Sequence, residues 1–347
     1  MVKVKHTESD STASNEFEFG TTSSDVEVTT GERLRDIYEE FVYKPGLVAW
    51  DDRRTRIGSI ILFAYVLIGT VGVWLYEAPA TNQDPRSLQP FEQFFVAPLG
   101  TTGSGEDVLA MAIHATPAML IMVLAGGVFA TGFAVLIGTV AGYKGGATDR
   151  LLTTFSDIAM SIPGLPLIMV VAIILSPENP AVIGVIITIN YWAGLARSIR
   201  SQVLAIREHS YVEASRTMGT GTARIIVKDI IPNIMPYVLV NFANAARYVI
   251  FAAVGLYYLG VLPTSVSNWG IQLNNAYKQA GALSGGGTFY QLLVPMAFIM
   301  FIALAFILLA QGMDRVFNPR VRTRMAGESK SESDNENDSV APTEVMN

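Results

Sequence analysis

Long apolar stretches alternate with short polar segments along most of the chain. Each stretch holds about 20 residues, the number that lets a helix cross a hydrocarbon core of about 30 Å. The stretches lack the period-two alternation of strands, and only helices or closed barrels satisfy all backbone groups in lipid. The pattern therefore predicts an all-α polytopic membrane protein with six transmembrane helices, at residues 57–76, 116–143, 151–175, 181–199, 237–262 and 291–311.

The start of the second predicted span carries the clearest helix-start signal. Thr116 is a suitable N-cap residue, and Pro117 is tolerated at the first position of a helix. The second and third spans are separated by the turn sequence Gly142-Tyr143-Lys144-Gly145-Gly146. We therefore expect a helix to begin at Thr116 and a tight turn to follow near residue 144.

Composition supports a membrane protein and excludes several kinds of chemistry. Half of the residues are hydrophobic and the mean hydropathy is +0.37. The chain has no cysteine, which excludes disulfides, thiolate metal sites and cysteine nucleophiles. The first 40 residues are polar and acidic, unlike a cleavable signal peptide.

The acidic residues are concentrated at the two ends of the chain. Residues 1–40 hold ten Asp/Glu against four Lys/Arg, and residues 326–347 hold six against one. Such segments cannot bury enough apolar surface to order themselves. The sequence therefore predicts four regions: a disordered acidic tail (1–44), the first span with a long external loop (45–115), a transmembrane core (116–315) with a structured loop at 205–236, and a second acidic tail (316–347).

The basic residues beside the spans predict the orientation. Cytoplasmic flanks of membrane helices carry an excess of Lys and Arg. With the N-terminus inside, the cytoplasmic flanks hold sixteen basic residues and the external loops hold only Arg86 and Lys278. Both termini and the 205–236 loop are therefore predicted to be cytoplasmic, in a multi-pass protein of the cell membrane surrounded by lipid.

The 205–236 loop has a spaced pattern that begins at Glu213-Ala214-Ser215, continues at Gly219 and ends at Ile231-Pro232. Residues 211–218 contain no Gly or Pro and predict a short helix, which Gly219 ends. Thr222 is a predicted N-cap for a second helix, with Ile226 and Ile230 on one face and Arg224 and Lys228 on another. The residues alone fit a surface gripped by another protein or an interfacial loop without a partner.

The spacing of these loop residues resembles the "EAA" loop of permease subunits of ATP-binding-cassette (ABC) importers. Similar motifs occur over about residues 45–325. They are Gly142-Tyr143 with Gly145-Gly146, Asp149-Arg150-Leu151, Asp157 with Pro163-Gly164, Trp192-Ala193-Gly194-Leu195-Ala196-Arg197, Leu259-Gly260-Val261, Trp269-Gly270 and Gly312-Met313-Asp314-Arg315. Together they resemble the "C"-type permease subunit of the dipeptide/oligopeptide/nickel branch, which has the type I importer fold.

The sequence departs from the pattern of that family at two places. Members usually have Gly-Arg-Asp in the external loop, where this chain has Gly105-Glu106-Asp107. An acidic residue often precedes the Leu-Gly motif, and residues 252–255 contain none. Both changes concern contacts with substrate or partner and leave the class of protein unchanged.

The resemblance implies a set of partners. Two ATPase subunits would bind ATP and Mg and would grip the loop at Glu213, Ala214, Ser215, Gly219, Arg224, Ile231 and Pro232. A second permease subunit would complete the pathway, with a heterodimer expected and a homodimer left open. An extracytoplasmic binding protein would deliver the substrate, which we expect to be a peptide, with nickel or another small solute as the alternative.

The fifth predicted span has one polar face. Arg247 lies about ten residues into it, near the middle of the membrane, where a charge is costly and should face protein or water. Asn241, Asn244 and Tyr248 recur at helical spacing beside it. This face is predicted to line a translocation pathway, and an internal hydrogen-bond network between helices is the alternative.

The sequence predicts no active site, metal site or nucleic-acid partner in this chain. The phosphate-binding pattern G-x-x-x-x-G-K-[ST] is missing, so ATP hydrolysis must come from other subunits. His6, His114 and His209 are not spaced to share a metal. An intramembrane hydrolase is disfavoured because the one deep carboxylate, Asp157, fits packing or an ion pair better. A secondary transporter acting alone is disfavoured because internal repeats are not apparent.

Overall fold

The computed structural model describes residue 50 and residues 52–278, 281–283 and 287–317. The predicted N-terminal tail and nearly all of the predicted C-terminal tail lie outside these residues. The described chain is helical apart from its loops and one isolated β-bridge. Four of its helical segments are long and apolar enough to cross a membrane: Arg53–Leu75, Val108–Lys144, Thr222–Tyr258 and Tyr290–Asp314.

Two further spans are each built from a pair of helices. Helix α6 (Gly146–Ser161) meets α7 (Gly164–Leu175) at 83°, and α8 (Pro180–Ile187) meets α9 (Tyr191–Ile206) at 60°. Counting each pair as one span gives the six predicted spans, and the bends within the third and fourth spans are features that the sequence analysis did not predict. The first bend falls at Pro163, which disfavours helical backbone at the preceding residue, and Ile162 is extended with ψ 125°.

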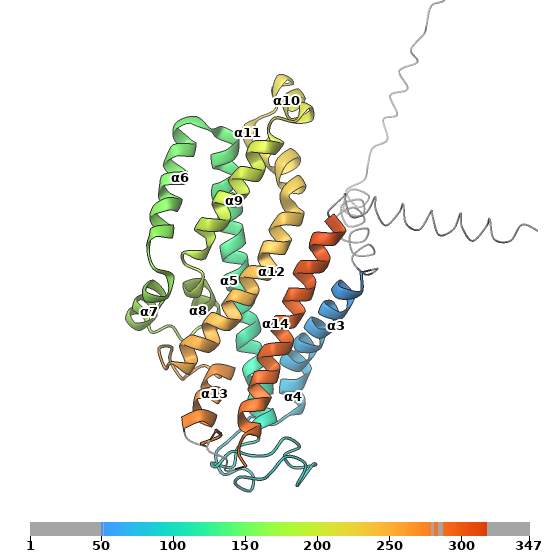
Figure 1. Cartoon of the computed structure of the whole chain (residues 1–347), viewed down its shortest axis with the longest axis vertical. Coiled ribbons are helices and arrows are strands. Elements are labelled where there is room, and N and C mark those ends of the chain that lie inside the picture. Colours follow the sequence, from blue (N-terminus) through green and yellow to red (C-terminus); the bar gives the residue numbers. More distant parts are fainter. Residues whose placement is uncertain (1–49, 51, 279–280, 284–286, 318–347) are drawn as a thin grey trace, which may run out of the picture. The chain divides into compact units, whose positions relative to one another are not determined.

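The remaining helices complete the order along the chain (Figure 1). The first span combines α3 (Arg53–Leu67), a π-turn η2 (Ile68–Gly72) and α4 (Val73–Leu75), and the second is α5 (Val108–Lys144). After α9 come α10 (Ser210–Thr217), α11 (Thr222–Ile225), a π-turn η3 (Ile226–Ile230), α12 (Ile231–Tyr258), α13 (Trp269–Lys278) and α14 (Tyr290–Phe317).

Helix α5 begins eight residues earlier than the sequence predicted. Its N-cap is Asp107, whose carboxylate accepts a hydrogen bond from the Leu109 N–H at 2.8 Å. Burial raises the pKa of Asp107, although the capped N–H groups of Leu109 and Ala110 oppose that rise. Thr116 is buried within the helix and donates its hydroxyl hydrogen to the Ala112 carbonyl, so its prediction as an N-cap was wrong.

Small residues let α5 pack closely against α8 and α9. Gly126, Ala130, Ala134, Gly138 and Gly142 recur at every fourth position and are all buried. A Cβ added at Gly126 would lie 2.6 Å from the Gly184 carbonyl oxygen on α8, so only glycine allows this approach. A stripe of small residues is the usual way for membrane helices to approach each other.

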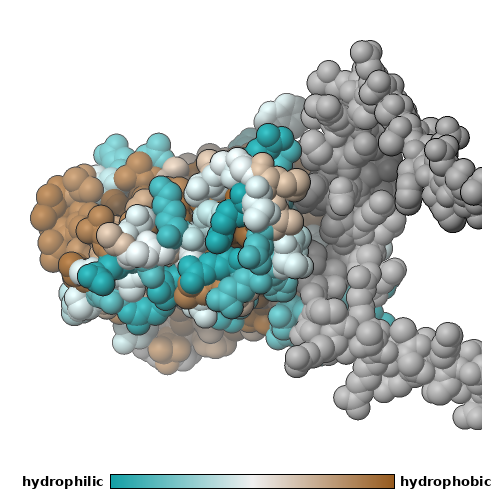
Figure 2. All heavy atoms as spheres, turned by 90° about the horizontal axis from the view of Figure 1, so that it is seen from above, coloured by the Kyte–Doolittle hydropathy of each residue, from teal (hydrophilic) through white to brown (hydrophobic). Residues whose placement is uncertain are grey.

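The loops sort to two ends of the helical bundle (Figure 1). Helices α10 and α11 and the α5–α6 turn lie at one end, and α13 and residues 77–107 lie at the other. Seen from the α10 end, hydrophilic residues gather over the loops, and hydrophobic residues cover the side where α6 and α7 lie (Figure 2). Among the described residues, the 205–236 loop and the α5–α6 turn, both predicted to be cytoplasmic, therefore share one end.

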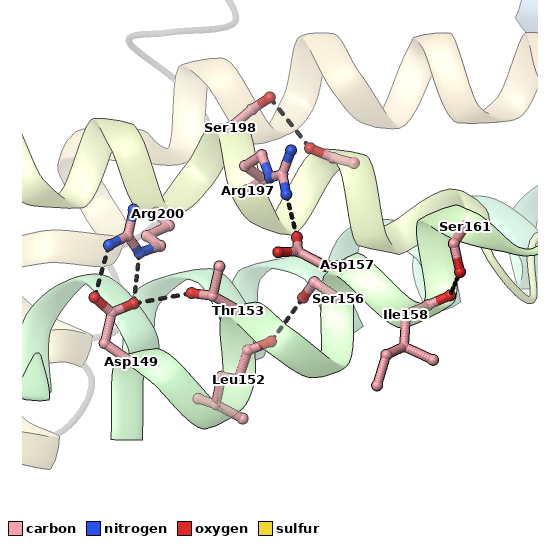
Figure 3. Close-up of polar contacts among 11 residues, drawn as sticks. Asp149, Leu152, Thr153, Ser156, Asp157, Ile158, Ser161, Arg197, Ser198 and Arg200 are labelled. Atoms are coloured by element: carbon pink, nitrogen blue, oxygen red, sulfur yellow. Dashed lines mark hydrogen bonds and ion pairs between the residues drawn. The ribbon is translucent and has the colours of Figure 1, made fainter. Parts of the chain in front are cut away.

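Ion pairs fasten α6 to α9 near the α10 end (Figure 3). Asp149 accepts two hydrogen bonds from Arg200, with Nε–Oδ1 at 2.5 Å and Nη2–Oδ2 at 2.6 Å. A second pair joins Asp157 to Arg197, which confirms the prediction of an ion-pair role for Asp157. The Asp149 pair is the more buried, with side-chain exposures of 19% and 30% against 47% and 51%.

We expect Asp149→Ala to lower the free energy of unfolding by roughly 1–3 kcal/mol, because it leaves a partly buried guanidinium without its bidentate partner. Asp157→Ala is the matched control, and its half-exposed pair should contribute about 1 kcal/mol or less. Thermal unfolding of the purified protein in detergent would measure both. Equal losses in the two variants would contradict the ranking.

Candidate functional site

Helix α10 and the turn after it form a self-contained local structure. The helix spans Ser210–Thr217, within one residue of the predicted 211–218. It ends at Gly219, whose φ is +76°. The Thr220 N–H donates to the Ser215 carbonyl at 3.1 Å and the Gly219 N–H to the Arg216 carbonyl at 3.0 Å. These two bonds define a Schellman motif, which explains why a glycine follows Ser215 at this distance.

Gly219→Ala should therefore destabilise the end of α10 by about 1–2 kcal/mol, because a residue with a Cβ is strained at positive φ. No atom lies within 4 Å of the added Cβ, so the effect would come from the backbone alone. Gly221→Ala is the control, since Gly221 has φ −65° and equally open space. Hydrogen exchange of the α10 amides should accelerate in the first variant only, and equal exchange in both would refute the assignment.

Helix α10 presents one face to the protein and the other to solvent. Val212 is fully buried and packs in a core cluster that includes Val203 on α9 and Ile225 on α11. Glu213 and Ala214 are exposed and Ser215 is half-buried. Val212 therefore packs α10 against the core while Glu213 and Ala214 face outward.

Basic residues tie this region to the end of α5. Arg207 donates from Nη1 to the Gly142 carbonyl at 2.9 Å, and the Arg216 guanidinium lies 5.9 Å from the centre of the Tyr143 ring. Together with Lys144, Glu208, Glu213, Thr220 and Thr222 they line a depression of about 750 Å³. The loop thus offers a hollowed, charged surface.

Four large apolar side chains of the 205–236 loop are exposed: Met218 is 78% exposed, Val227 61%, Tyr211 42% and Met235 36%. The sequence pattern did not identify them as contact residues. The available signal was the presence of large apolar residues within a polar segment. Their exposure marks a surface that a partner protein would bury.

The second half of the loop differs from the prediction. Ile226 and Ile230 are buried and Arg224 and Lys228 are exposed, which confirms the predicted faces. The helix begins at Thr222 with Gly221 as its N-cap residue, so the prediction of Thr222 as N-cap was wrong.

Ile231 and Pro232, at which the spaced pattern of the loop ends, lie at the start of α12. Both residues are half-buried within an unbroken helical segment, Thr222–Tyr258. Proline lacks the N–H that would bond one turn back, and the π-turn Ile226–Ile230 lies directly before it. The predicted coupling residues therefore lie on α10 and the turn after it, on α11 (Arg224) and at the start of α12 (Ile231 and Pro232).

The four predicted pathway residues all lie on α12 and are half-buried. The Asn241 amide donates to the Tyr237 carbonyl at 2.8 Å. The ring centres of Tyr248 and Tyr191 are 4.8 Å apart, so the polar face of α12 meets α9. Among the described residues, none forms an ion pair with Arg247. Asn244 lies one turn before Tyr248.

The described part of the chain contains no group of three His, Asp or Glu side chains that could hold a metal ion. The candidate site has an exposed, charged surface, and the buried Val212 side chain packs it against the core. Its geometry suits protein binding at α10.

Residues 134–323 match the family described as binding-protein-dependent transport system inner membrane component. The chain is 26% identical over 296 residues to the oligopeptide transport system permease protein OppC of Bacillus subtilis, covering 82% of this chain and 93% of that protein. It is 29% identical over 266 residues to the dipeptide transport system permease protein DppC of the same organism, covering 76% and 80%. It is 27% identical over 307 residues to OppC of Haemophilus influenzae, covering 84% and 94%.

The family match spans more than half of the chain and includes α6 to α14 with the 205–236 loop. The similarity to the named permeases extends over most of their length. The helical architecture and its six apolar spans agree with this assignment. The chain belongs to the binding-protein-dependent transport system inner membrane component family, as a multi-pass permease subunit of an ABC importer.

Proposed function

We propose that this subunit forms half of a transmembrane pathway for peptides that an extracytoplasmic binding protein delivers. The support is its similarity to permeases named for oligopeptide and dipeptide transport. A second permease subunit supplies the other half, as a heterodimer in our proposal. Nickel or another small solute is the alternative substrate.

We infer that α10 is the contact for a separate ATPase subunit, which binds ATP and Mg. The observation that carries this inference is the division of α10 into a buried Val212 and an exposed Glu213 and Ala214. One face of α10 packs against this subunit and the other is free to bind the ATPase. Movement of the bound ATPase would therefore move α10 and the core that it contacts. ATP-driven closure of two ATPases would then switch the paired permeases between two states.

The orientation follows from the same proposal. The α10 end of the bundle faces the cytoplasm, where an ATPase can reach it, and both termini lie on that side. Residues 77–107 and α13 then face outward, where a binding protein docks. The clustering of basic residues beside the α10 end supports this orientation.

The test is reconstitution of the complete transporter. The chain, the second permease, the ATPases and the binding protein would be purified together and placed in liposomes. We expect uptake of a labelled di- or oligopeptide that requires ATP inside and the binding protein outside, with no competition by nickel. Uptake by this chain alone, driven by an ion gradient, or cleavage of the peptide by this chain alone would overturn the proposal.

Arg247→Ala should lower peptide uptake about tenfold without lowering thermal stability, because a lone charge within a span is costly to bury. Arg247→Lys is the control for charge and should retain more uptake than the alanine variant. Initial uptake rates and melting temperatures in detergent would be compared. Unchanged uptake with reduced stability would assign Arg247 to an internal network.

A further inference from the structure

A cavity of about 330 Å³ lies beside α13. Helix α13 is at the end of the bundle opposite α10 (Figure 1). The cavity forms where a tight turn, the start of α5, helix α13 and the start of α14 meet. Its lining includes Thr102, Ser104, Glu106, Gln272 and Gln291. The volume falls within the usual range of small-molecule sites, and most of the lining side chains are polar.

Glu106 is the one charged side chain among these lining residues. It lies on a turn in which the Thr102 N–H donates to the Glu106 carbonyl at 2.9 Å. Its carboxylate Oε2 accepts hydrogen bonds from the hydroxyls of Ser104 at 2.8 Å and Thr102 at 3.3 Å. The turn therefore holds a half-buried carboxylate in a fixed position, which favours a cationic ligand group.

This turn is held against α14. The Tyr290 hydroxyl donates to the Thr101 carbonyl at 2.6 Å, and the Gln291 amide donates to the same carbonyl at 3.3 Å. Gln291 thus uses its amide to support the wall of the cavity.

Gln272 on α13 also lines the cavity, but its amide does not support the turn through a hydrogen bond. It is 7% exposed, and neither its amide nitrogen nor its amide oxygen has a hydrogen-bond partner among the residues that the structure describes. Helix α13 is fixed in place, because the buried Trp269 ring donates to the Ala112 carbonyl at 3.0 Å. An amide buried without partners is costly, and a ligand that supplies both a donor and an acceptor removes that cost.

We propose that this cavity receives the amino-terminal end of a peptide, with the ammonium group at Glu106 and the first peptide group at Gln272. A peptide group offers one N–H and one carbonyl, which complement the oxygen and nitrogen of a side-chain amide. This inference rests on the proposed transport of peptides and adds the end of the peptide that this subunit recognises.

The experiment compares uptake of one peptide with a free amino terminus and the same peptide N-acetylated, by the complete transporter in liposomes. Glu106→Gln removes the charge, and Glu178→Gln, an exposed carboxylate between α7 and α8, is the matched control. We expect Glu106→Gln to raise the half-saturating concentration of the free peptide about tenfold and to leave that of the acetylated peptide unchanged. Selection by the binding protein is common to all variants and cancels in this comparison.

Gln272→Met provides an independent arm. Because the amide has no partner to lose, this variant should keep or raise the melting temperature while it weakens uptake of both peptides. A lower melting temperature with unchanged half-saturation would assign Gln272 a structural role and overturn its part in the proposal.

Other outcomes separate the possible failures. Equal losses for the free and acetylated peptides in Glu106→Gln, with weaker attachment of the binding protein, would make the cavity a protein-docking site and refute the proposal. Variants that match the wild type would refute it as well. Failure of the wild-type transporter to take up any peptide would instead refute the proposed function.

Discussion

Gly138→Leu should abolish or severely reduce the folded protein. Gly138 lies at the closest approach of α5 to α9, and an added Cβ would lie 2.6 Å from the Ala196 carbonyl oxygen and 2.9 Å from the Ile199 Cβ. Neither a backbone carbonyl nor a branched β-carbon can move aside without separating the helices. We expect a loss of at least about 3 kcal/mol, the upper end of the usual cost of overpacking.

Gly132→Leu is the matched control on the same helix. Gly132 is exposed, and an added Cβ would meet no atom within 4 Å. This variant should fold as well as the wild type or slightly better, because leucine favours a helix more than glycine does. The fraction of monodisperse protein after detergent extraction and its melting temperature would be measured. Similar behaviour of the two variants would contradict the assigned α5–α9 contact.

Glu213→Lys should reduce ATP-driven uptake at least tenfold while the subunit remains folded. The side chain is exposed on α10, so its replacement removes no packing. Reversal of its charge places a cation on the surface that we assign to the ATPase, and like charges or an unpaired charge at an interface weaken association. Either the ATPase will co-purify poorly or it will hydrolyse ATP without transport. Affinity of the binding protein for its peptide should stay constant.

The control is Glu178→Lys, the same charge reversal at an exposed position between α7 and α8. It should leave ATPase attachment and the ratio of ATP hydrolysed to peptide transported as in the wild type. If Glu213→Lys transported peptide at the normal ratio, α10 would not be the coupling surface. If both variants failed equally, the effect would be a general response to added positive charge.

The six spans and the α10 helix could be predicted from the sequence because local chemistry decides them. Lipid requires a helix of a certain length wherever a long apolar stretch occurs, and the 211–218 segment contains no helix breaker. Pro163 also carried a local signal for the first bend. These features depend on residues close together in the chain.

The errors arose where distant or competing contacts decide the structure. Asp107 is the N-cap of α5 in place of Thr116, because the apolar residues between the two continue the helix toward its N-terminus. The bend between α8 and α9 has no proline. The Thr188 hydroxyl at that point lies 3.1 Å from the Gly184 carbonyl one turn back and 3.2 Å from the Gly126 carbonyl on α5, 62 positions away. Glu106 and Gln272 line the same cavity but are even farther apart in the sequence than Thr188 and Gly126. No sequence spacing therefore indicated the cavity.

The unbroken segment Thr222–Tyr258 has a mechanical consequence. At a rise of 1.5 Å per residue its 37 residues form a rod about 55 Å long, which exceeds the hydrocarbon thickness by about 25 Å. One end lies beside α10, and at the other end the Asn274 side chain of α13 donates to the Tyr258 carbonyl. A tilt of about five degrees at the loop would displace the far end by about 5 Å, close to one helical turn. The helix thus links the α10 end of the bundle directly to α13, the helix that carries Gln272.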